Sequence, residues 1–477
     1  FIIIFMKLFF RITNAFFLVL TVLCMVFACH FLHTRSNVYQ SYDVKLENVL
    51  AFSEKTSFMI GDSIKLKIHS KNECFGQLLK MEDSIRLIVD SIEINEYSQS
   101  NIFNPIVGFS WRTNLKICTD SLNSGYYLFK VFEKGNINNQ YFHPIIINPI
   151  ETTSISIIAS TNTWQCYNDY GGISNYNDKI RPKYFQKITS LFPSTKPITY
   201  CSNQRPFSFM INEKADFEVA HTDNKNTGLI NELDTLGKSD YPIISYDSIK
   251  LPKQHIFGEQ LLITFLENQN IEYGVYSDLD FAYNADIFNS DLIIFHMHSE
   301  YWSQEMVGKL EAYCSNGGHV IFASGNNLYR EVEFYEKGIK VFDEFDGFLT
   351  RSLTGTVYSE TTYPINSSYK VNLPEHWVFN DCNLIKGDTI CFNGSGWETD
   401  KVGHGSSNFK ILATGLNKVG PAQMVINEFD NGGWLFNASS MTFTQSIVND
   451  NTTKKLILNL IKSAQGSSYD TTTNNIN

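Results

Sequence analysis

The sequence has relatively few basic residues. It contains 38 lysines and arginines against 49 aspartates and glutamates, which gives a formal net charge of -11. Nucleic acids and anionic membrane surfaces are bound through clustered Lys and Arg side chains. The charge balance therefore argues against nucleic acid as a partner and leaves small neutral or cationic ligands open.

Several catalytic and metal-binding motifs are also missing. No G-x-S-x-G occurs and no cysteine lies on a Gly-flanked turn, which disfavours acyl transfer by serine or cysteine. No phosphate-binding glycine motif follows a strand, which disfavours nucleotide cofactors. None of the nine cysteines forms a C-x-x-C pair, which disfavours structural zinc. Cys382 and Cys391 either form a disulfide bond in an oxidising compartment or remain free thiols.

The N-terminal segment has the pattern of an export signal. Lys7 and Arg11 precede an apolar run from Ala15 to Cys29. Such a run has the length of a signal h-region and is short for a membrane span, which needs roughly 20 residues. Residues 1–35 therefore predict a cleaved signal or a short membrane anchor, and the rest of the chain is expected to be secreted, periplasmic or anchored outside.

The length and the first apolar pattern predict an N-terminal β domain. A chain of 477 residues exceeds the size at which single cores stop growing, about 250 to 300 residues. In residues 40–150 apolar residues alternate with polar ones, as in Ile64-Leu66-Ile68 and Tyr127-Phe129-Val131. Because period two is typical of half-buried strands, this region predicts a β-sandwich.

Residues 151–463 predict an α/β domain. Apolar strands alternate with helices, which indicates a doubly wound parallel sheet of the flavodoxin or amidotransferase type. The expected elements are strands at 154–160, 271–277, 291–298 and 319–324, with helices at 258–270 and after Ser303. Short strands after Tyr358 predict a β-rich extension before a last helix at 453–463. Residues 464–477 have low complexity and are expected to be disordered.

Polar residues follow three of the predicted strands. Ligands of open α/β sheets bind outside the carboxyl ends of the strands, so we expect these residues to converge on one crevice. They comprise a loop from Thr161 to Gly172, then His296, His298 and Glu300, and finally Asn326 within Ser324-Gly325-Asn326-Asn327. Carboxylate and phenolate oxygens suit a hard ion such as ferric iron. The alternatives are that Tyr167 packs structurally, that Glu300 caps the next helix, and that His296 is a buried structural histidine.

Six short motifs carry a family resemblance. The stretches TWQCYNDYGG, RPF, HSEYWS, SGNNLY, LPEHWVF and GWETD occur in this order through the α/β region, and SGYYLFKV precedes them. Together they resemble the large (beta) subunit family of N,N-dimethylformamidase. The resemblance covers most of the chain after the signal segment. It implies a mononuclear iron held by two tyrosines and a glutamate, with amide hydrolysis at the metal.

The resemblance assigns roles to individual residues. Tyr167 and Glu300 match metal ligands, and His298, Asn326 and Glu398 match catalytic residues. The second tyrosine is expected in the RPF motif, where this chain has Phe207. A phenyl ring cannot bind a metal, so either Tyr170, Tyr176 or Tyr200 replaces it, or iron binding is weakened or lost.

The sequence therefore predicts an iron-dependent hydrolase that cleaves the C-N bond of a small amide substrate. A cell-surface binding or assembly protein that keeps the fold without the metal is the alternative. A metal-free glycosidase built on Glu300 and Glu398 is a third, and it would require carboxyl groups roughly 5 to 9.5 Å apart. A homo-oligomer is left open.

Overall fold

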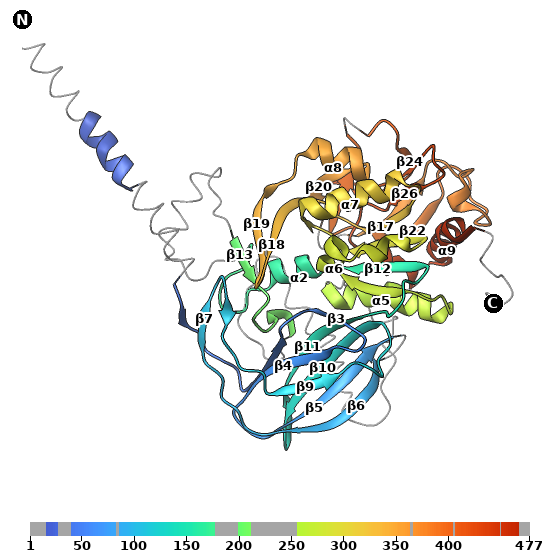
Figure 1. Ribbon diagram of the computed structural model, residues 1–477. Coiled ribbons are helices and arrows are strands. Elements are labelled where there is room, and N and C mark those ends of the chain that lie inside the picture. Colours follow the sequence, from blue (N-terminus) through green and yellow to red (C-terminus); the bar gives the residue numbers. More distant parts are fainter. Residues whose placement is uncertain are drawn as a thin grey trace, which may run out of the picture.

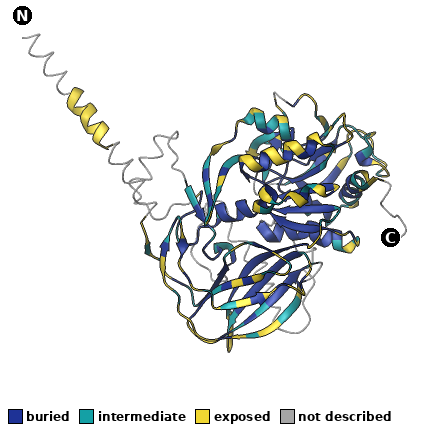
Figure 2. Cartoon of the chain, viewed as in Figure 1, coloured by how far each residue is buried: buried dark blue, intermediate teal, exposed yellow. Residues whose placement is uncertain are grey.

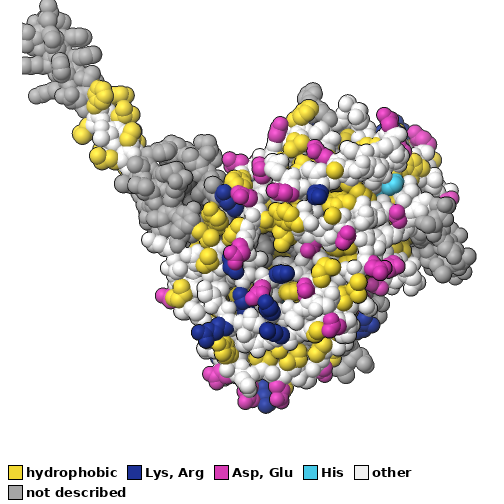
Figure 3. All heavy atoms as spheres, viewed as in Figure 1, with side chains coloured by type: hydrophobic (Ala, Val, Ile, Leu, Met, Phe, Trp, Pro, Cys, Tyr) yellow, Lys and Arg dark blue, Asp and Glu magenta, His cyan; other side chains and the backbone are white. Residues whose placement is uncertain are grey.

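The structure is a computed structural model, which describes residues 16–26, 40–82, 85–176, 199–210, 255–362, 366–403, 406–448 and 450–466. Residues 16–26 form a helix whose apolar side chains are exposed, as Figure 3 shows. No helix within the described ranges is long and apolar enough to cross a membrane. The remainder of the predicted signal segment, and residues 467–477 of the predicted tail, lie outside the described residues.

The N-terminal part consists of three small β-sheets. Two of them face each other, since β2 packs against β10 and β11. One sheet has the order β2-β4-β9, the second has the order β3-β11-β10-β5-β6, and the third has the order β1-β7-β8. All pairs are antiparallel except β3 with β11. The bounds are β1 Tyr42–Asp43, β2 Val49–Ser53, β3 Ser57–Met59, β4 Ser63–Ser70, β5 Cys74–Met81, β6 Ile85–Ile94, β7 Ile102–Asn104, β8 Gly108–Phe109, β9 Leu115–Cys118, β10 Gly125–Glu133 and β11 Asn136–Asn148.

The predicted alternation holds for β4 and fails for β10. Ile64, Leu66 and Ile68 of β4 are fully buried, while the residues at 63 and 65 are exposed. In β10 every residue from 125 to 131 is buried. The reason is that β10 is covered on both faces: one faces β2, and the other faces the α/β part, where Tyr126 reaches Glu259.

The α/β part is built on a nine-stranded sheet with the order β14-β12-β15-β17-β26-β25-β24-β21-β22. The first five strands are parallel and the other pairs are antiparallel. Counted along the chain, the parallel strands have the order 2-1-3-4-5, which is the flavodoxin-like order. The predicted β-rich extension therefore continues the same sheet (Figure 1). The bounds are β12 Ile155–Ala159, β14 Gly274–Ser277, β15 Leu292–Met297, β17 His319–Ser324, β21 Ser367–Val371, β22 Thr389–Ser395, β24 Lys410–Gly415, β25 Gln423–Glu428 and β26 Trp434–Asn437.

Helices cover both faces of this sheet. Along β15, Ile294 packs in one hydrophobic cluster together with α5 and α9, while Ile293 and Phe295 pack in another together with α6 and α7. This two-sided burial explains the continuous apolar strands, which Figure 2 shows as buried. The sequence-based fold class, an N-terminal β part followed by a doubly wound α/β part, is confirmed. The helices are α2 Thr161–Tyr167, α5 His255–Asn268, α6 Asp278–Tyr283, α7 Gln304–Ser315, α8 Gly347–Thr354 and α9 Asn451–Gln465.

Smaller elements flank the sheet. One four-stranded sheet has the order β13-β19-β18-β16, and β20 pairs with β23. These strands are β13 Thr199–Ser202, β16 Tyr301–Trp302, β18 Arg330–Tyr335, β19 Gly338–Glu344, β20 Val357–Thr361 and β23 Glu398–Lys401. Helix α9 ends at Gln465, so the predicted tail begins two residues too early. Cys382 and Cys391 are free thiols, which is the second of the two predicted alternatives.

The two parts share a hydrophobic core. One cluster of buried side chains runs from the N-terminal sheets through β12 and α5 to α9. Polar contacts cross the same boundary: the Tyr126 hydroxyl lies 2.8 Å from Glu259 Oε2, and the Ser57 and Ser277 hydroxyls are 3.0 Å apart. The β part therefore buttresses the elements that follow β12 and β14.

Candidate metal site at the sheet switch point

The candidate site lies where the strand order reverses, between β12 and β15. In the 2-1-3-4-5 order the connections after these two strands leave in opposite directions and open a crevice at the carboxyl edge. Residues 161–167, predicted as part of a loop, form the short helix α2. The carboxylate of Asp278 fixes its first turn by accepting hydrogen bonds from the Asn162 backbone nitrogen (2.7 Å) and the Thr161 hydroxyl (3.4 Å). Helix α2 brings Thr163 and Tyr167 to the crevice.

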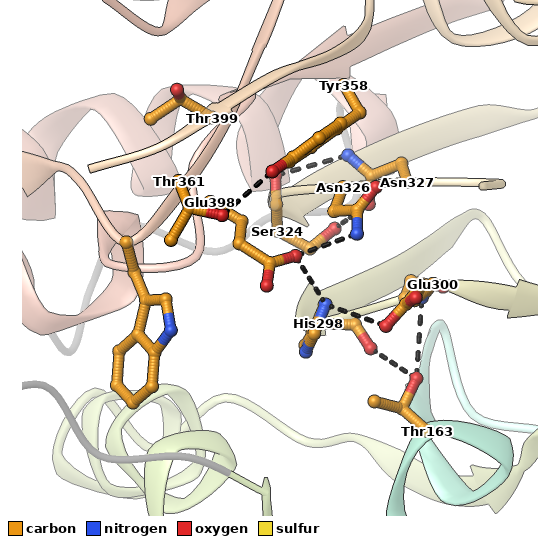
Figure 4. Close-up of polar contacts among 12 residues, drawn as sticks. Thr163, His298, Glu300, Ser324, Asn326, Asn327, Tyr358, Thr361, Glu398 and Thr399 are labelled. Atoms are coloured by element: carbon orange, nitrogen blue, oxygen red, sulfur yellow. Dashed lines mark hydrogen bonds and ion pairs between the residues drawn. The ribbon is translucent and has the colours of Figure 1, made fainter. Parts of the chain in front are cut away.

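Three titratable side chains meet in the crevice, and Figure 4 shows them pointing at one another. His298 Nε2 lies 3.3 Å from Glu300 Oε2 and 3.1 Å from Glu398 Oε2. Ligand atoms of the three residues lie within 4.8 Å of one another. His298 and Glu300 follow β15, whereas Glu398 begins β23. This buried group could hold a metal ion.

Two phenols adjoin the group. The Tyr176 hydroxyl donates a hydrogen bond to Glu300 Oε1. The Tyr167 ring lies 4.7 Å from the Tyr176 ring and 5.4 Å from the His298 ring, measured between centroids. Both phenols contribute hydrogen bonding that favours the ionised form of Glu300. The crevice therefore collects five oxygen or nitrogen donors from α2, the segment after it, the end of β15 and β23.

Asn326 joins the group through Glu398. Its side-chain nitrogen donates to Glu398 Oε2 at 2.7 Å. Asn326 has a φ of 52°, in the left-handed region, and its backbone nitrogen donates to Asp400 Oδ1 at 2.9 Å. A Cβ at Gly325 would lie 2.4 Å from the Glu398 carbonyl oxygen, so only glycine permits this approach of β17 to β23.

Burial and charge together set the ionisation of the group. Burial raises the pKa of Glu300, although the His298 imidazole offsets part of the effect. Burial alone would lower the pKa of His298, but the carboxylates of Glu398 and Glu300 outweigh it and raise this pKa above its usual value. Burial, followed by the negative charge of Glu300, raises the pKa of Tyr167 and Tyr176 well above the usual range. A cation would relieve this accumulation of acidic groups.

The structure also places the other sequence-predicted residues. The Phe207 ring packs away from the crevice, against His143 and Phe209, with ring centroids 6.0 and 5.0 Å away. Of the three possible replacements, Tyr176 contacts Glu300. Tyr170 instead donates to Glu47, and the Tyr200 ring packs on Tyr335.

The structure rejects the helix-cap alternative for Glu300 and agrees with the buried-histidine alternative for His296. Glu300 does not cap α7, because the Ser303 side chain accepts from the Met306 backbone nitrogen at that helix start. His296 is fully buried, and its Nε2 lies 3.0 Å from the Tyr126 hydroxyl.

Sequence reasoning missed two contributors. Thr163 donates from its hydroxyl to the His298 carbonyl oxygen at 2.8 Å and so ties α2 to the end of β15. Asp400 lies two residues after Glu398 in the GWETD motif and is 1% exposed. The sequence did contain a signal for Asp400. Alternate residues of a strand point the same way, so an acidic residue two positions after Glu398 lies on the same side of the strand.

These observations define a two-part α/β protein with a candidate metal site at the switch point of a flavodoxin-like sheet. The family model described as N,N-dimethylformamidase beta subunit-like, C-terminal, matches residues 96–347 and 342–454. The chain belongs to this family. No curated protein matches the sequence.

Two similar solved structures each cover less than half of the chain. An "mmIFT52 N-terminal domain" has 11% identity and a TM-score of 0.28, and covers 43% of this chain and 89% of its own. A putative ThuA-like protein from Parabacteroides merdae has 13% identity and a TM-score of 0.25, and covers 40% of this chain and 81% of its own.

Proposed function

We propose that the protein is a metal-dependent hydrolase that cleaves the C-N bond of a small amide. Family membership supports the reaction class. The observation that carries the proposal is the buried group of His298, Glu300 and Glu398 beside two phenols. Buried ionisable groups are costly unless they are paired or bind an ion.

The donor set fits iron of the tyrosine and glutamate type. Tyr167, Tyr176 and Glu300 would hold it, since hard anionic oxygens stabilise ferric iron. Two observations support the fit: Glu300 is fully buried, and Tyr176 hydrogen-bonds to it while the Tyr167 ring lies 4.7 Å from the Tyr176 ring. The substitution at Phe207 does not remove a donor in this arrangement, because Tyr176 supplies the second phenol.

Iron bound there would act as a Lewis acid toward an amide carbonyl. The protein's own groups would handle protons and orientation. The raised pKa of His298 favours its protonated form, which can pass a proton to the departing amine. Asn326 Oδ1 is buried and has no hydrogen-bond partner within the described part of the chain, so it can accept from a substrate N-H.

Glu398 is the most accessible member of the group. Its side chain is 15% exposed, whereas those of His298 and Glu300 are 3% and 0% exposed. We therefore infer that substrate enters past Glu398. There the carboxylate, held by Asn326 and His298, can act as a general base toward water.

The rivals have less support. The binding-protein alternative rested on Phe207 and on the attached β part. The β part is present, but the Phe207 ring packs against His143 and Phe209, while Tyr176 hydrogen-bonds to Glu300. In a glycosidase the sugar would occupy the space between the two carboxylates. Here His298 Nε2 occupies it, in contact with both Glu300 and Glu398.

The test combines elemental analysis with amide hydrolysis by purified protein. We expect about one iron per chain, a visible phenolate-to-iron absorption band, and release of an amine from small N-alkyl amides. If a metal other than iron is bound and amides are hydrolysed, the proposed hydrolase function would be supported and the proposed identity of the metal would be wrong. Absence of bound metal combined with no amine release would reject the proposal. We also propose export, to be checked by fractionation and N-terminal sequencing of the native protein.

A further inference from the structure

A second cavity, of about 300 Å³, lies on the other side of α2 from the candidate metal site. Thr161 and Gln165 line this cavity, and they are one helical turn apart on the same side. Thr163 and Tyr167 contact His298, and they are also one turn apart, on the opposite side. The helix α2 therefore forms a common wall between two separate polar sites.

The cavity is formed by parts of the chain that are distant in sequence. Its walls come from α2, the start of α6, the β3 region, the end of β11 and the turn between β18 and β19. It thus lies at the carboxyl ends of β12 and β14, where the N-terminal part packs on the sheet. Its volume is at the lower end of the range for small-molecule sites, about 300 to 1,000 Å³.

Two buried amides in the lining lack a partner. Gln165 is 6% exposed and Asn148 is 2% exposed. Gln165 Oε1 and Asn148 Oδ1 have no hydrogen-bond partner within the described residues. Nearly all buried polar atoms in proteins are hydrogen-bonded, so these two oxygens require a donor from outside the described residues, which a bound ligand can supply.

The charged residues of the lining are mostly acidic. Glu54, Asp62, Asp280 and Glu336 face one basic residue, Lys55, among the lining residues. Glu54 and Glu336 pair with Lys65 and Lys337, which lie outside the lining. Within the described residues Asp62 and Asp280 accept hydrogen bonds only from neutral groups, the Met59 backbone nitrogen for Asp62 and Ser277 for Asp280. The site therefore disfavours anions.

We propose that this cavity binds a small alkylammonium ion. Its two buried atoms without a partner in the described residues are acceptors, two of its carboxylates have no basic partner within the same residues, and Phe334 and Tyr335 supply an aromatic wall for an alkyl group. An ammonium group donates up to three hydrogen bonds and accepts none, which matches this lining. The inference is independent of the proposed hydrolase function, because binding is measured with the amine alone.

The experiment is calorimetric titration of the protein with n-propylammonium chloride. Propan-1-ol and sodium propionate serve as a neutral and an anionic probe of the same shape. We expect saturable binding of the ammonium ion that weakens with salt, and at least tenfold weaker binding of both other probes. Equal binding of propan-1-ol, or no binding of the ammonium ion, would overturn the proposal.

Variants locate the binding. Gln165→Met keeps the volume and removes the unpaired oxygen, so we expect an unchanged thermal midpoint and roughly tenfold weaker ammonium binding. Gln304→Met, on exposed α7, is the matched control and should bind normally. Glu300→Gln should also bind normally, and loss of binding there would move the ammonium to the candidate metal site and contradict the assignment.

Asp62→Asn keeps the proposal testable if Gln165→Met fails to fold. The asparagine oxygen can still accept from the Met59 backbone nitrogen, so the fold should persist. We expect it to weaken ammonium binding several-fold and to reduce the salt dependence, while unchanged binding would count against this cavity.

Discussion

His296 lies near the end of β15 and His298 follows directly after this strand, and each histidine faces a buried glutamate. His296 Nε2 lies 3.7 Å from Glu259 Oε2, and His298 Nε2 lies 3.3 Å from Glu300 Oε2. All four side chains are almost fully buried. Burial lowers the pKa of His296 to about 3, whereas the pKa of His298 is raised above its usual value. The same pair of residue types thus has opposite charge preferences at histidine positions two residues apart.

The difference comes from the number of carboxylates beside each imidazole. Glu259 accepts from the Tyr126 hydroxyl (2.8 Å), the Trp164 indole (2.8 Å) and the Ser160 backbone nitrogen (3.3 Å). Burial nevertheless raises the pKa of Glu259 to about 7. The second pair has an additional carboxylate, Glu398, on the same imidazole. Three neutral donors satisfy Glu259 in the first pair. In the second pair two carboxylates lie beside one imidazole, and a cation can neutralise their excess negative charge.

The largest expected effect is that of Glu300→Gln. Removing one anionic oxygen from the centre of the donor group should cost metal affinity and lower amide hydrolysis by about 100-fold or more. The thermal midpoint should stay close to that of the native protein, because the residue contributes little to either hydrophobic cluster. Glu311→Gln, on α7, is the matched control. A large loss of stability with unchanged metal content would make Glu300 structural, like Glu259.

Glu259→Gln should change the pH dependence of stability without touching the metal. The pKa of Glu259 is about 7 in the folded state against 4.5 for an ordinary glutamate. Stability from this group is therefore fully present below pH 4.5 and is lost as the pH rises through 7, by about 3 kcal/mol. Glutamine mimics the protonated form and should remove this loss.

The measurement is urea unfolding of native protein and Glu259→Gln at pH 5 and pH 8. The free energy of unfolding of the variant should exceed that of the native protein at pH 8, and the two should be closer at pH 5. An equal difference at both values would show that Glu259 does not change its ionisation in this range. Metal content should be the same in both proteins.

Tyr176→Phe and Phe207→Tyr compare two tyrosine positions. We expect Tyr176→Phe to lower metal affinity by about tenfold and to weaken the phenolate absorption band. Phe207→Tyr should gain no metal, because its ring packs on His143 and Phe209. It should instead lose about 1 to 3 kcal/mol through overpacking. Increased metal occupancy in Phe207→Tyr would restore the RPF position as the ligand site.

The smallest effect is expected for Asp400→Asn. Asp400 accepts from the backbone nitrogen of Asn326 and so holds the side chain that contacts Glu398. We expect hydrolysis to fall several-fold with metal content unchanged, because the residue positions Asn326 and is not among the proposed ligands. Asp388→Asn, at an exposed turn, is the control. Loss of metal in Asp400→Asn would instead make it part of the metal site.

The strand and helix pattern of the sheet could be predicted because burial on two faces leaves a clear mark in the sequence. The apolar runs at β12, β15 and β17 follow from this burial. The start of α7 was predictable from a separate signal, the Ser303 cap. The full burial of β10 could not be predicted, because it depends on α5 and Glu259, which are more than a hundred residues away.

The sequence could predict the site residues that directly follow strands. It could not predict the site residues whose positions depend on contacts with other segments. His298, Glu300 and Asn326 come directly after β15 and β17, and the strand order brings them together. The choice of Tyr176 over Tyr170 or Tyr200 depends on the turn after α2, whose course no local pattern specifies. The role of Asp400 depends on the left-handed turn at Asn326, which only contact with β23 explains.

The most direct test of the contrast between the two histidine–glutamate pairs is the metal content of three purified proteins, measured side by side by elemental analysis. The account predicts about one iron per chain in the native protein, the same in Glu259→Gln, and little or none in Glu300→Gln. Equal metal in Glu300→Gln and native protein, or absence of metal from all three, would contradict the claim that the His298 group is a metal site.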